Sequence, residues 1–147
     1  MLHIWASIPL ALLKKKARPV AYVKRANVQS SFASRTMMWS GPIIAAFVVF
    51  HLLHLTTGTL HPNFAKLDAY NNLVTGFKVI PAAIAYIVAM VLIGMHLSHG
   101  IWSMFQSVGI SHPRYTPMVK KFAAVVSWIL AAGFVSVPVA VLTGLLR

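Results

Sequence analysis

Three long apolar stretches dominate the chain, at residues 37–60, 79–105 and 122–146. None of them contains a charged residue, and each is longer than the roughly 20 residues that an α-helix needs to cross a bilayer. The charged residues gather in the segments between them. The pattern predicts an all-α membrane protein in which residues 1–147 form a single membrane-anchor domain with three full transmembrane helices, as part of a helix bundle.

A fourth apolar stretch, residues 1–13, is too short to span a bilayer and is followed at once by Lys14, Lys15 and Lys16. In a secretory signal peptide the positive charges precede the apolar core. We therefore expect residues 1–13 to be the last half of a transmembrane helix that begins before residue 1.

The charges between the apolar stretches predict an orientation. Lys and Arg are frequent in residues 14–35 and 106–121, whereas residues 61–78 hold two lysines and one aspartate. Because membrane proteins concentrate Lys and Arg in their cytoplasmic loops, the first two segments are expected inside the cell and the third outside.

Composition agrees with a membrane protein and excludes several kinds of chemistry. Hydrophobic residues make up 59% of the chain, and the mean hydropathy is +0.77. There is no cysteine, so disulfides and thiolate sites are excluded, and the single acidic residue, Asp68, excludes paired-carboxylate catalysis. The net charge of +12 fits the loop bias better than nucleic-acid binding, because no basic patch is interleaved with aromatic residues.

Histidines interrupt two of the apolar stretches in pairs of equal spacing, His51 with His54 and His96 with His99. An ionisable side chain within a span is costly and usually marks a function. The alternative is that each imidazole only makes a hydrogen bond between helices.

The expected depth of these histidines favours haem. At 1.5 Å per residue, His96 lies roughly 12–14 Å from the inner end of its helix and His3 about 15 Å from Lys14, so the two are expected at one level. His51 lies about 21 Å from Met37, in the outer half, with no partner at its level. Two imidazoles at one depth on separate helices suit bis-histidine haem ligation, whereas zinc needs more ligands at one level.

Small residues beside His96 fit this interpretation. Gly94, Ser98 and Gly100 surround it, and we expect them to leave room for the macrocycle between helices. The remaining histidines, His61 and His112, lie in loops beside prolines and are expected to be structural or solvated.

Longer motifs in the chain resemble a known family. The segments "ASRTMMWSG", "FHLLH" and "YIVAMVLIGMHLSHGIWSMFQSVGISHPRYTP" resemble the membrane-anchor cytochrome b of succinate dehydrogenases and fumarate reductases, in its five-helix, two-haem, single-subunit type. By this resemblance, we expect the given sequence to begin within that type's second helix, without its first. The resemblance implies a multi-pass protein of the bacterial inner membrane that carries electrons between membrane quinone, menaquinone or another, and an iron–sulfur subunit. The iron–sulfur subunit in turn exchanges electrons with a flavoprotein that interconverts succinate and fumarate. The chain would be an electron-transfer subunit, non-catalytic by itself.

The resemblance also implies haem ligands. By position, His3, His51 and His96 match the ligands of the family's second, third and fourth helices. His3 and His96 would bind one haem b completely, while a second haem would combine His51 with a ligand from the missing helix or another chain. His54 and His99, three residues further on, are expected beside the pockets or in hydrogen bonds between helices.

Polar residues near the inner face are expected around the haem propionates, and for Arg35 the alternative is that it only follows the positive-inside bias. They are Arg35, Ser31, Ser34 and Gln106.

Two other functions compete with electron transfer. A haem-free, truncated scaffold would only hold the soluble subunits at the membrane. A proton channel or transporter would need acids or a file of polar groups within the spans, and no span contains an acid.

Overall fold

A computed structural model of the chain describes residues 2–17, 20 and 32–147. Contacts divide the chain into two units, Met1–Ser30 and Ser31–Arg147, and each is described by itself. The first unit contains the helix α1 (Leu2–Ala17). The α1 helix includes the apolar stretch predicted as a half-helix, continues through the three lysines and has Pro9 in its interior.

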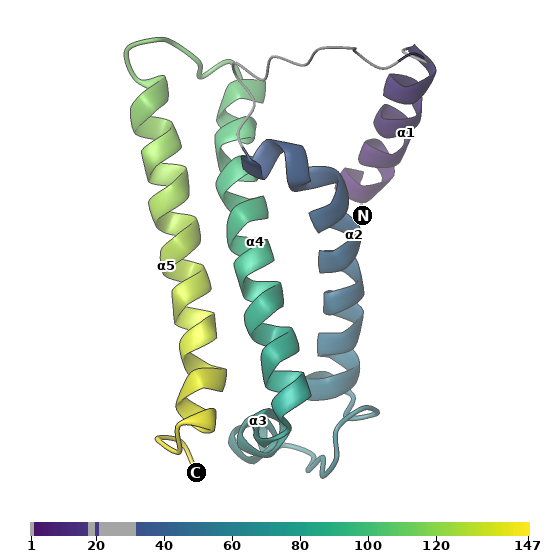
Figure 1. The fold of residues 1–147 in the computed structure, drawn as a ribbon, viewed down its shortest axis with the longest axis vertical. Helices are drawn as coiled ribbons and strands as arrows, with labels where there is room; N and C mark the ends of the chain where they lie inside the picture. Colours follow the sequence, from purple (N-terminus) through teal and green to yellow (C-terminus); the bar gives the residue numbers. More distant parts are fainter. Residues whose placement is uncertain (1, 18–19, 21–31) are drawn as a thin grey trace. The chain divides into compact units, whose positions relative to one another are not determined.

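The second unit is built on three helices that are long and apolar enough to cross a membrane, and Figure 1 shows them side by side. They are α2 (Phe32–His51), α4 (Ile80–Ser107) and α5 (Thr116–Leu142). The described residues form helices and connecting segments without a strand. The predicted class, an all-α membrane protein with three full spans, is confirmed.

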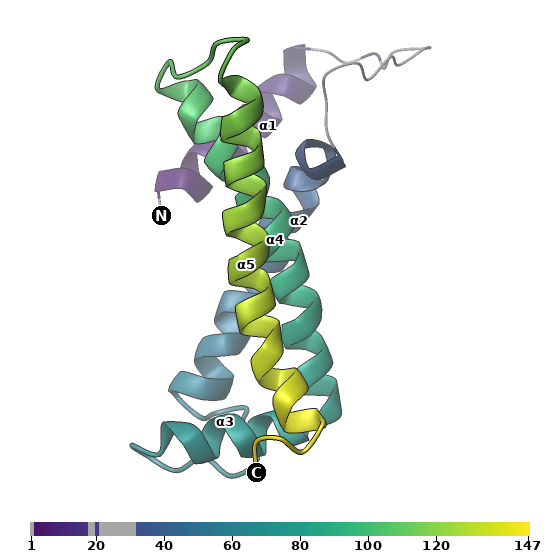
Figure 2. The ribbon, with the colours of Figure 1, turned by 90° about the vertical axis from the view of Figure 1, so that its left-hand side faces the viewer.

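Helix α4 is the centre of this unit, because both α2 and α5 pack against it. Its contact with α5 depends on small residues: a Cβ on Gly94 would lie 3.0 Å from the Cβ of Ala131, and Ser127 is fully buried. Small residues let helix backbones approach closely in a membrane, where apolar side chains gain little by leaving lipid for protein. Figure 2 shows α4 and α5 running along each other from a second direction.

The first span ends earlier than residues 37–60 predicted. After His51 the chain continues as a short π-helix, η1 (Leu52–Thr56), in which the N–H of Thr57 donates to the carbonyl of Leu52 at 2.8 Å. Gly58 then has a φ of 74°, a conformation that favours glycine. The helical segment therefore stops at Thr56, because the backbone turns away at Gly58.

A short helix that hydropathy did not predict, α3 (Ala69–Lys78), lies across one end of the bundle (Figure 1). It begins at Asp68, whose carboxylate accepts a hydrogen bond from the N–H of Asn71 at 3.0 Å, an N-cap that satisfies a free backbone donor. Val79 ends α3 and precedes α4, and Pro81 occupies the first turn of α4. This α3 end also contains the buried core, which comprises Val74, Phe77, Ala83, Tyr86 and Val141.

Two buried polar side chains attach the preceding loop to α3. The Asn72 amide donates to the Ala65 carbonyl at 2.7 Å and accepts from the Ala65 N–H at 2.8 Å. His61 Nε2 lies 2.7 Å from the Asn72 carbonyl oxygen, and His61 Nδ1 accepts from the N–H of Asn63 at 3.1 Å. Since His61 accepts at Nδ1, its proton is on Nε2, which donates to Asn72.

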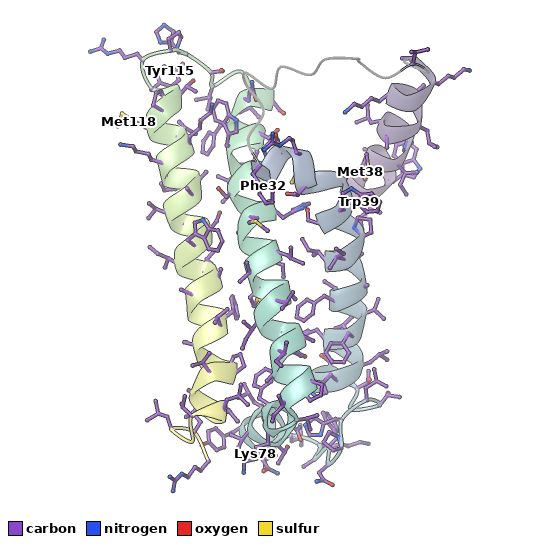
Figure 3. The ribbon with its side chains drawn as sticks, viewed as in Figure 1. Phe32, Met38, Trp39, Lys78, Tyr115 and Met118 are labelled. Atoms are coloured by element: carbon purple, nitrogen blue, oxygen red, sulfur yellow. The ribbon has the colours of Figure 1, made fainter. Side chains whose placement is uncertain are left out.

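At the end of the bundle away from α3, a contact between a lysine and a tryptophan joins α4 to α5. The ammonium group of Lys120 lies 4.7 Å from the centre of the Trp102 ring, a cation–π contact between the end of α4 and the start of α5. Figure 3 shows Tyr115 and Met118 at this end and Lys78 at the α3 end. A lysine beside a tryptophan at a helix end is typical of residues at a membrane–water interface.

Gly76 tests the packing at the α3 end. In Gly76→Ala the new Cβ would lie 2.8 Å from the His54 ring and 3.0 Å from His61, so we expect the free energy of unfolding to fall by about 1–3 kcal/mol. The measurement is an SDS titration of the micelle-bound protein, followed by circular dichroism. The control is Gly133→Ala in α5, where nothing lies within 4 Å of the new Cβ. Equal stability of the two variants would contradict this packing.

Candidate functional site

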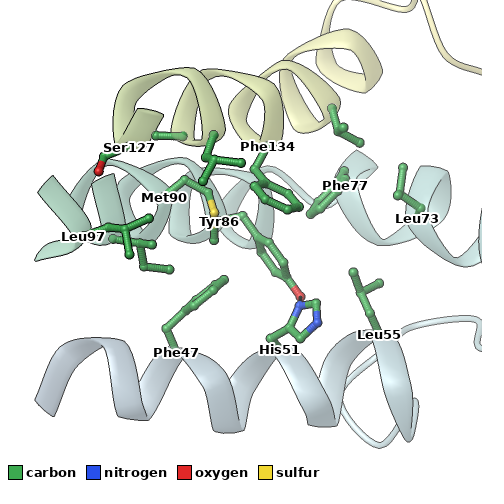
Figure 4. A pocket seen from close by; sticks show the side chains of 14 residues that line it. Phe47, His51, Leu55, Leu73, Phe77, Tyr86, Met90, Leu97, Ser127 and Phe134 are labelled. Atoms are coloured by element: carbon green, nitrogen blue, oxygen red, sulfur yellow. Dashed lines mark hydrogen bonds between the residues drawn. The ribbon is translucent and has the colours of Figure 1, made fainter. Parts of the chain in front are cut away.

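A cavity of about 470 Å³ lies on one face of α4, with walls from α2, η1, α3 and α5 (Figure 4). Its lining is almost entirely apolar, and the polar exceptions are one imidazole and two hydroxyl groups. The lining residues are Phe47, His51, Leu55, Leu73, Phe77, Tyr86, Met90, Ile93, Leu97, Ser127, Leu130, Ala131, Phe134 and Val137. The Ser127 hydroxyl is already bonded to the Ala123 carbonyl at 2.7 Å. His51 and Tyr86 therefore provide the polar chemistry of the cavity.

His51 is the last residue of α2 and is half-buried at the cavity wall. Its Nδ1 lies 3.2 Å from the Tyr86 hydroxyl oxygen, a contact drawn in Figure 4. The π-helix that begins at the next residue interrupts the regular α-helical pattern here, and such interruptions are frequent at functional sites.

Tyr86 connects His51 to a second imidazole. Its hydroxyl oxygen also lies 3.2 Å from Nδ1 of His54. The edge-to-face contacts of the Tyr86 ring with Phe47 and Phe77, at centroid distances of 5.0 and 4.8 Å, hold the ring in place. One buried tyrosine on α4 therefore bridges two histidines of the α2–η1 segment.

His54 is packed inside the protein rather than at the cavity. It is only 2% exposed, its ring stacks on Phe50 at 5.3 Å with an interplanar angle of 9°, and Gly76 lies close to its Cε1 and Nε2 atoms. His61, a loop residue expected to be structural or solvated, is also buried, with its ring centre 5.1 Å from that of His54. His54 is thus hydrogen-bonded to Tyr86, which lines the cavity, and its predicted role beside a haem pocket stays a prediction.

His96 lies in the part of α4 nearer the opposite end. It is half-buried, and its Nδ1 lies 2.9 Å from the hydroxyl oxygen of Ser40 on α2. The Ser40 hydroxyl also lies 3.3 Å from the Met37 carbonyl, to which it donates. When the serine proton is used there, Ser40 accepts from Nδ1–H of His96, and that tautomer carries its lone pair on Nε2.

The two hydroxyl contacts show that His51 and His96 lie at different levels. Ser40 and His51 are eleven residues apart on α2, about 16 Å along the helix, and their partners on α4 are His96 and Tyr86. One planar group cannot contact both histidines. The sequence interpretation also assigns them to separate sites, and that assignment stays a prediction.

The small residues near His96 have different surroundings. Gly94 is buried where α4 meets α5, beside Ala131 and Trp128, so it serves helix packing and does not open space for a macrocycle. Gly100 has nothing within 4 Å of the position of a Cβ, and Ser98 and His99 are half-buried. The expectation that Gly94 makes room beside His96 is therefore wrong.

The structure describes the side chains of only some of the other predicted site residues. Arg35 is exposed in the second turn of α2, and Gln106 is exposed in the last turn of α4. His3 belongs to α1, but its side chain lies outside the described residues, as does all of Ser31. The pairing of His3 with His96 stays a prediction. Among the described side chains, no cluster of three or more histidines and acids could hold a free metal ion.

Sequence reasoning missed Tyr86, although a signal for it was present. Within residues 80–93 it carries the only side-chain hydroxyl or charge, and a lone polar group in a transmembrane helix indicates a buried partner. What the sequence did not show was which residues of the neighbouring helix it faces.

Three apolar spans and a cavity with a histidine in its wall define a polytopic helical membrane protein. The chain belongs to the succinate dehydrogenase/fumarate reductase transmembrane subunit family, whose model matches residues 14–137. This confirms the family that the motif "MHLSHGIWSMFQ" suggested. No curated protein and no solved structure matches the chain significantly.

Replacing His54 and His51 one at a time should show that they contribute differently to stability. We expect His54→Ala to lower the free energy of unfolding by about 2–4 kcal/mol, because it leaves a cavity against Phe50 and removes a partner of Tyr86. His51→Ala, at an open wall, should cost less than about 1 kcal/mol. SDS unfolding of the two cofactor-free variants measures this, and an equal loss in both would argue against the difference in burial.

Proposed function

We propose that this chain is the haem b-binding membrane anchor of a bacterial succinate:quinone oxidoreductase. In this role it binds the flavoprotein and iron–sulfur subunits at the inner membrane and carries electrons between the iron–sulfur subunit and membrane quinone, menaquinone or another. The family match supports an anchor subunit of succinate dehydrogenase or fumarate reductase. The chain is non-catalytic by itself, and the succinate site belongs to the other subunits.

The observation that carries this proposal is the cavity beside His51. Its volume, about 470 Å³, lies within the roughly 300–1,000 Å³ range of small-molecule and cofactor sites. Its apolar lining suits a flat, apolar macrocycle, and an imidazole at its wall is a normal axial ligand of haem iron. The donor set therefore fits haem, with His51 as one ligand.

A second imidazole at the cavity would come from beyond the described residues. His54 is enclosed between Phe50 and Gly76 and is already bonded to Tyr86, so we assign it to positioning rather than ligation. This choice agrees with the preference for His51 that the family pattern suggested.

His96 supports a second haem site nearer the opposite end. A metal-bound histidine usually donates its other ring N–H to a neighbouring acceptor, which fixes its tautomer. The Nδ1 contact with Ser40 has this form. We propose that His96 and His3 are the axial ligands there, with His99 near the pocket and Arg35, Ser31 and Gln106 near the propionates.

Bound haem supplies one-electron transfer within the membrane. The protein's own contribution is to hold the imidazoles in the correct tautomer, to exclude water with apolar side chains such as Phe47 and Phe134, and to keep the surroundings of low polarity. These factors tune the potential at which an electron arrives or leaves. A scaffold without haem would need none of them.

Haem content tests the proposal directly. We expect at least one haem b per chain, at the His96 site, when the anchor is purified from a haem-replete host together with its soluble subunits, measured by pyridine haemochrome against protein. Two per chain would mean that the His51 site obtains its second ligand from elsewhere. The absence of haem from both the complex and the isolated chain would leave the scaffold function.

A matched pair of variants tests the ligand assignment at His96. We expect His96→Ala to lose the haem of that site, and His99→Ala to retain it with a shifted midpoint potential, because the second residue only borders the pocket. Reduced-minus-oxidised spectra and a redox titration distinguish the two. Loss of haem in His99→Ala with retention in His96→Ala would exchange the two roles.

A further inference from the structure

The Tyr86 hydroxyl is shared by two imidazoles, and it has only one proton to donate. Its oxygen lies 3.2 Å from Nδ1 of His51 and 3.2 Å from Nδ1 of His54. It can donate to one of these nitrogens and accept from the other. When both contacts are hydrogen bonds, both rings are neutral and the hydroxyl proton is used in one of the two contacts, one histidine carries its proton on Nδ1 and the other on Nε2.

The surroundings of the far ring nitrogens distinguish the two possibilities. His51 lines a cavity whose other side chains are mostly apolar, and the one hydroxyl there besides that of Tyr86, the Ser127 hydroxyl, donates to a backbone carbonyl. An Nε2–H there would have no acceptor, and a buried donor without a partner is rarer than a buried acceptor without one.

For His54 the surroundings are more polar. A Cβ on Gly76 would lie 3.1 Å from Nε2 of His54 and 3.0 Å from Nε2 of His61, so both nitrogens border the same glycine. His61 Nε2 is bonded there to the carbonyl of Asn72 at 2.7 Å. His54 Nε2 therefore borders Gly76 of α3, close to the Asn72 carbonyl that His61 contacts.

We propose that Tyr86 and His54 act together to hold His51 in the Nδ1–H tautomer. His51 donates its Nδ1–H to the Tyr86 oxygen, Tyr86 donates its hydroxyl proton to Nδ1 of His54, and His54 carries its own proton on Nε2. The lone pair of His51 Nε2 is then available at the cavity, as a metal ligand requires.

This assigns a task to His54, the fully enclosed histidine. Without an acceptor at its position, the Tyr86 hydroxyl would turn its proton to His51, and His51 would carry its N–H toward the cavity. Tyr86 and His54 are therefore positioning residues for His51. The inference depends on the proposed function only for what His51 binds, because the tautomers can be measured without any cofactor.

The first experiment is ¹⁵N NMR of the haem-free full chain, labelled at histidine and held in lipid bilayers at a pH where the imidazoles are neutral. Loss of signal in His51→Gln assigns the His51 resonances. We expect His51 to be protonated at Nδ1 and His54 at Nε2 in the parent chain. A parent chain with His51 protonated at Nε2 would overturn the proposal.

Variants then test each partner. Tyr86→Phe should remove the preference of His51 for Nδ1–H, and His54→Leu should shift His51 towards Nε2–H. In His54→Asn the side-chain carbonyl occupies nearly the position of Nδ1 and still accepts from Tyr86, so the parent tautomer should return. The control is Tyr70→Phe, at an exposed hydroxyl bonded to the carbonyl of Arg147, and it should change nothing. An unchanged His51 in Tyr86→Phe would also overturn the proposal.

The haem-loaded complex gives an independent measurement. The hydrogen bond from Nδ1–H to Tyr86 increases the electron density that His51 gives to iron. Tyr86→Phe should therefore raise the midpoint potential of the haem bound at His51, whereas Tyr70→Phe should not. If no haem binds at His51, the proposed function of the cavity fails and the NMR result alone decides the tautomers. If haem binds with an unchanged potential, the positioning role fails and the proposed function stands.

Discussion

Hydrogen bonds between hydroxyl groups and imidazoles set how α2 and α4 face each other. Apolar side chains gain little by leaving lipid for a neighbouring helix, so polar contacts weigh heavily in choosing one register among several. Here two such contacts, Ser40 with His96 and Tyr86 with His51, lie about 16 Å apart along the bundle. Sliding either helix by one turn would break both, and each half-buried imidazole would lose its hydroxyl partner at a cost of roughly 1 kcal/mol.

The cavity follows from the way the other helices meet this pair. Gly94 and Ala131 bring α5 close to α4, while α2 packs on another part of α4. Since the backbones of α2 and α5 do not themselves pack together within residues 32–147, a space is left between them, and Leu73 and Phe77 of α3 line part of it. The cavity therefore follows from small residues that hold α5 against α4 while α2 packs elsewhere on α4.

Hydropathy and charge predicted the three spans, the class of protein and the separation of His51 from His96, because these depend on composition along a single helix. They did not predict α3, the π-helix after His51 or the bridge at Tyr86. The α3 helix depends on the N-cap of Asp68 and on the burial of Phe77 in the core, and it contains no long apolar run. The bridge depends on which residues of two helices meet, and a single sequence without related sequences contains no direct record of that pairing.

His54 lies three positions after His51, and on a helix both point in nearly the same direction, yet their surroundings differ. His51 faces a cavity, whereas the turn at Gly58 folds the following loop and α3 back over His54 and encloses it. The same hydroxyl can thus contact an imidazole at the cavity wall and one buried behind it. A single proton on Tyr86 then makes the two rings unequal, and the burial of the second ring keeps water from supplying an alternative donor or acceptor. The tautomer at the cavity is in this way a property of the loop fold as much as of the span that carries His51.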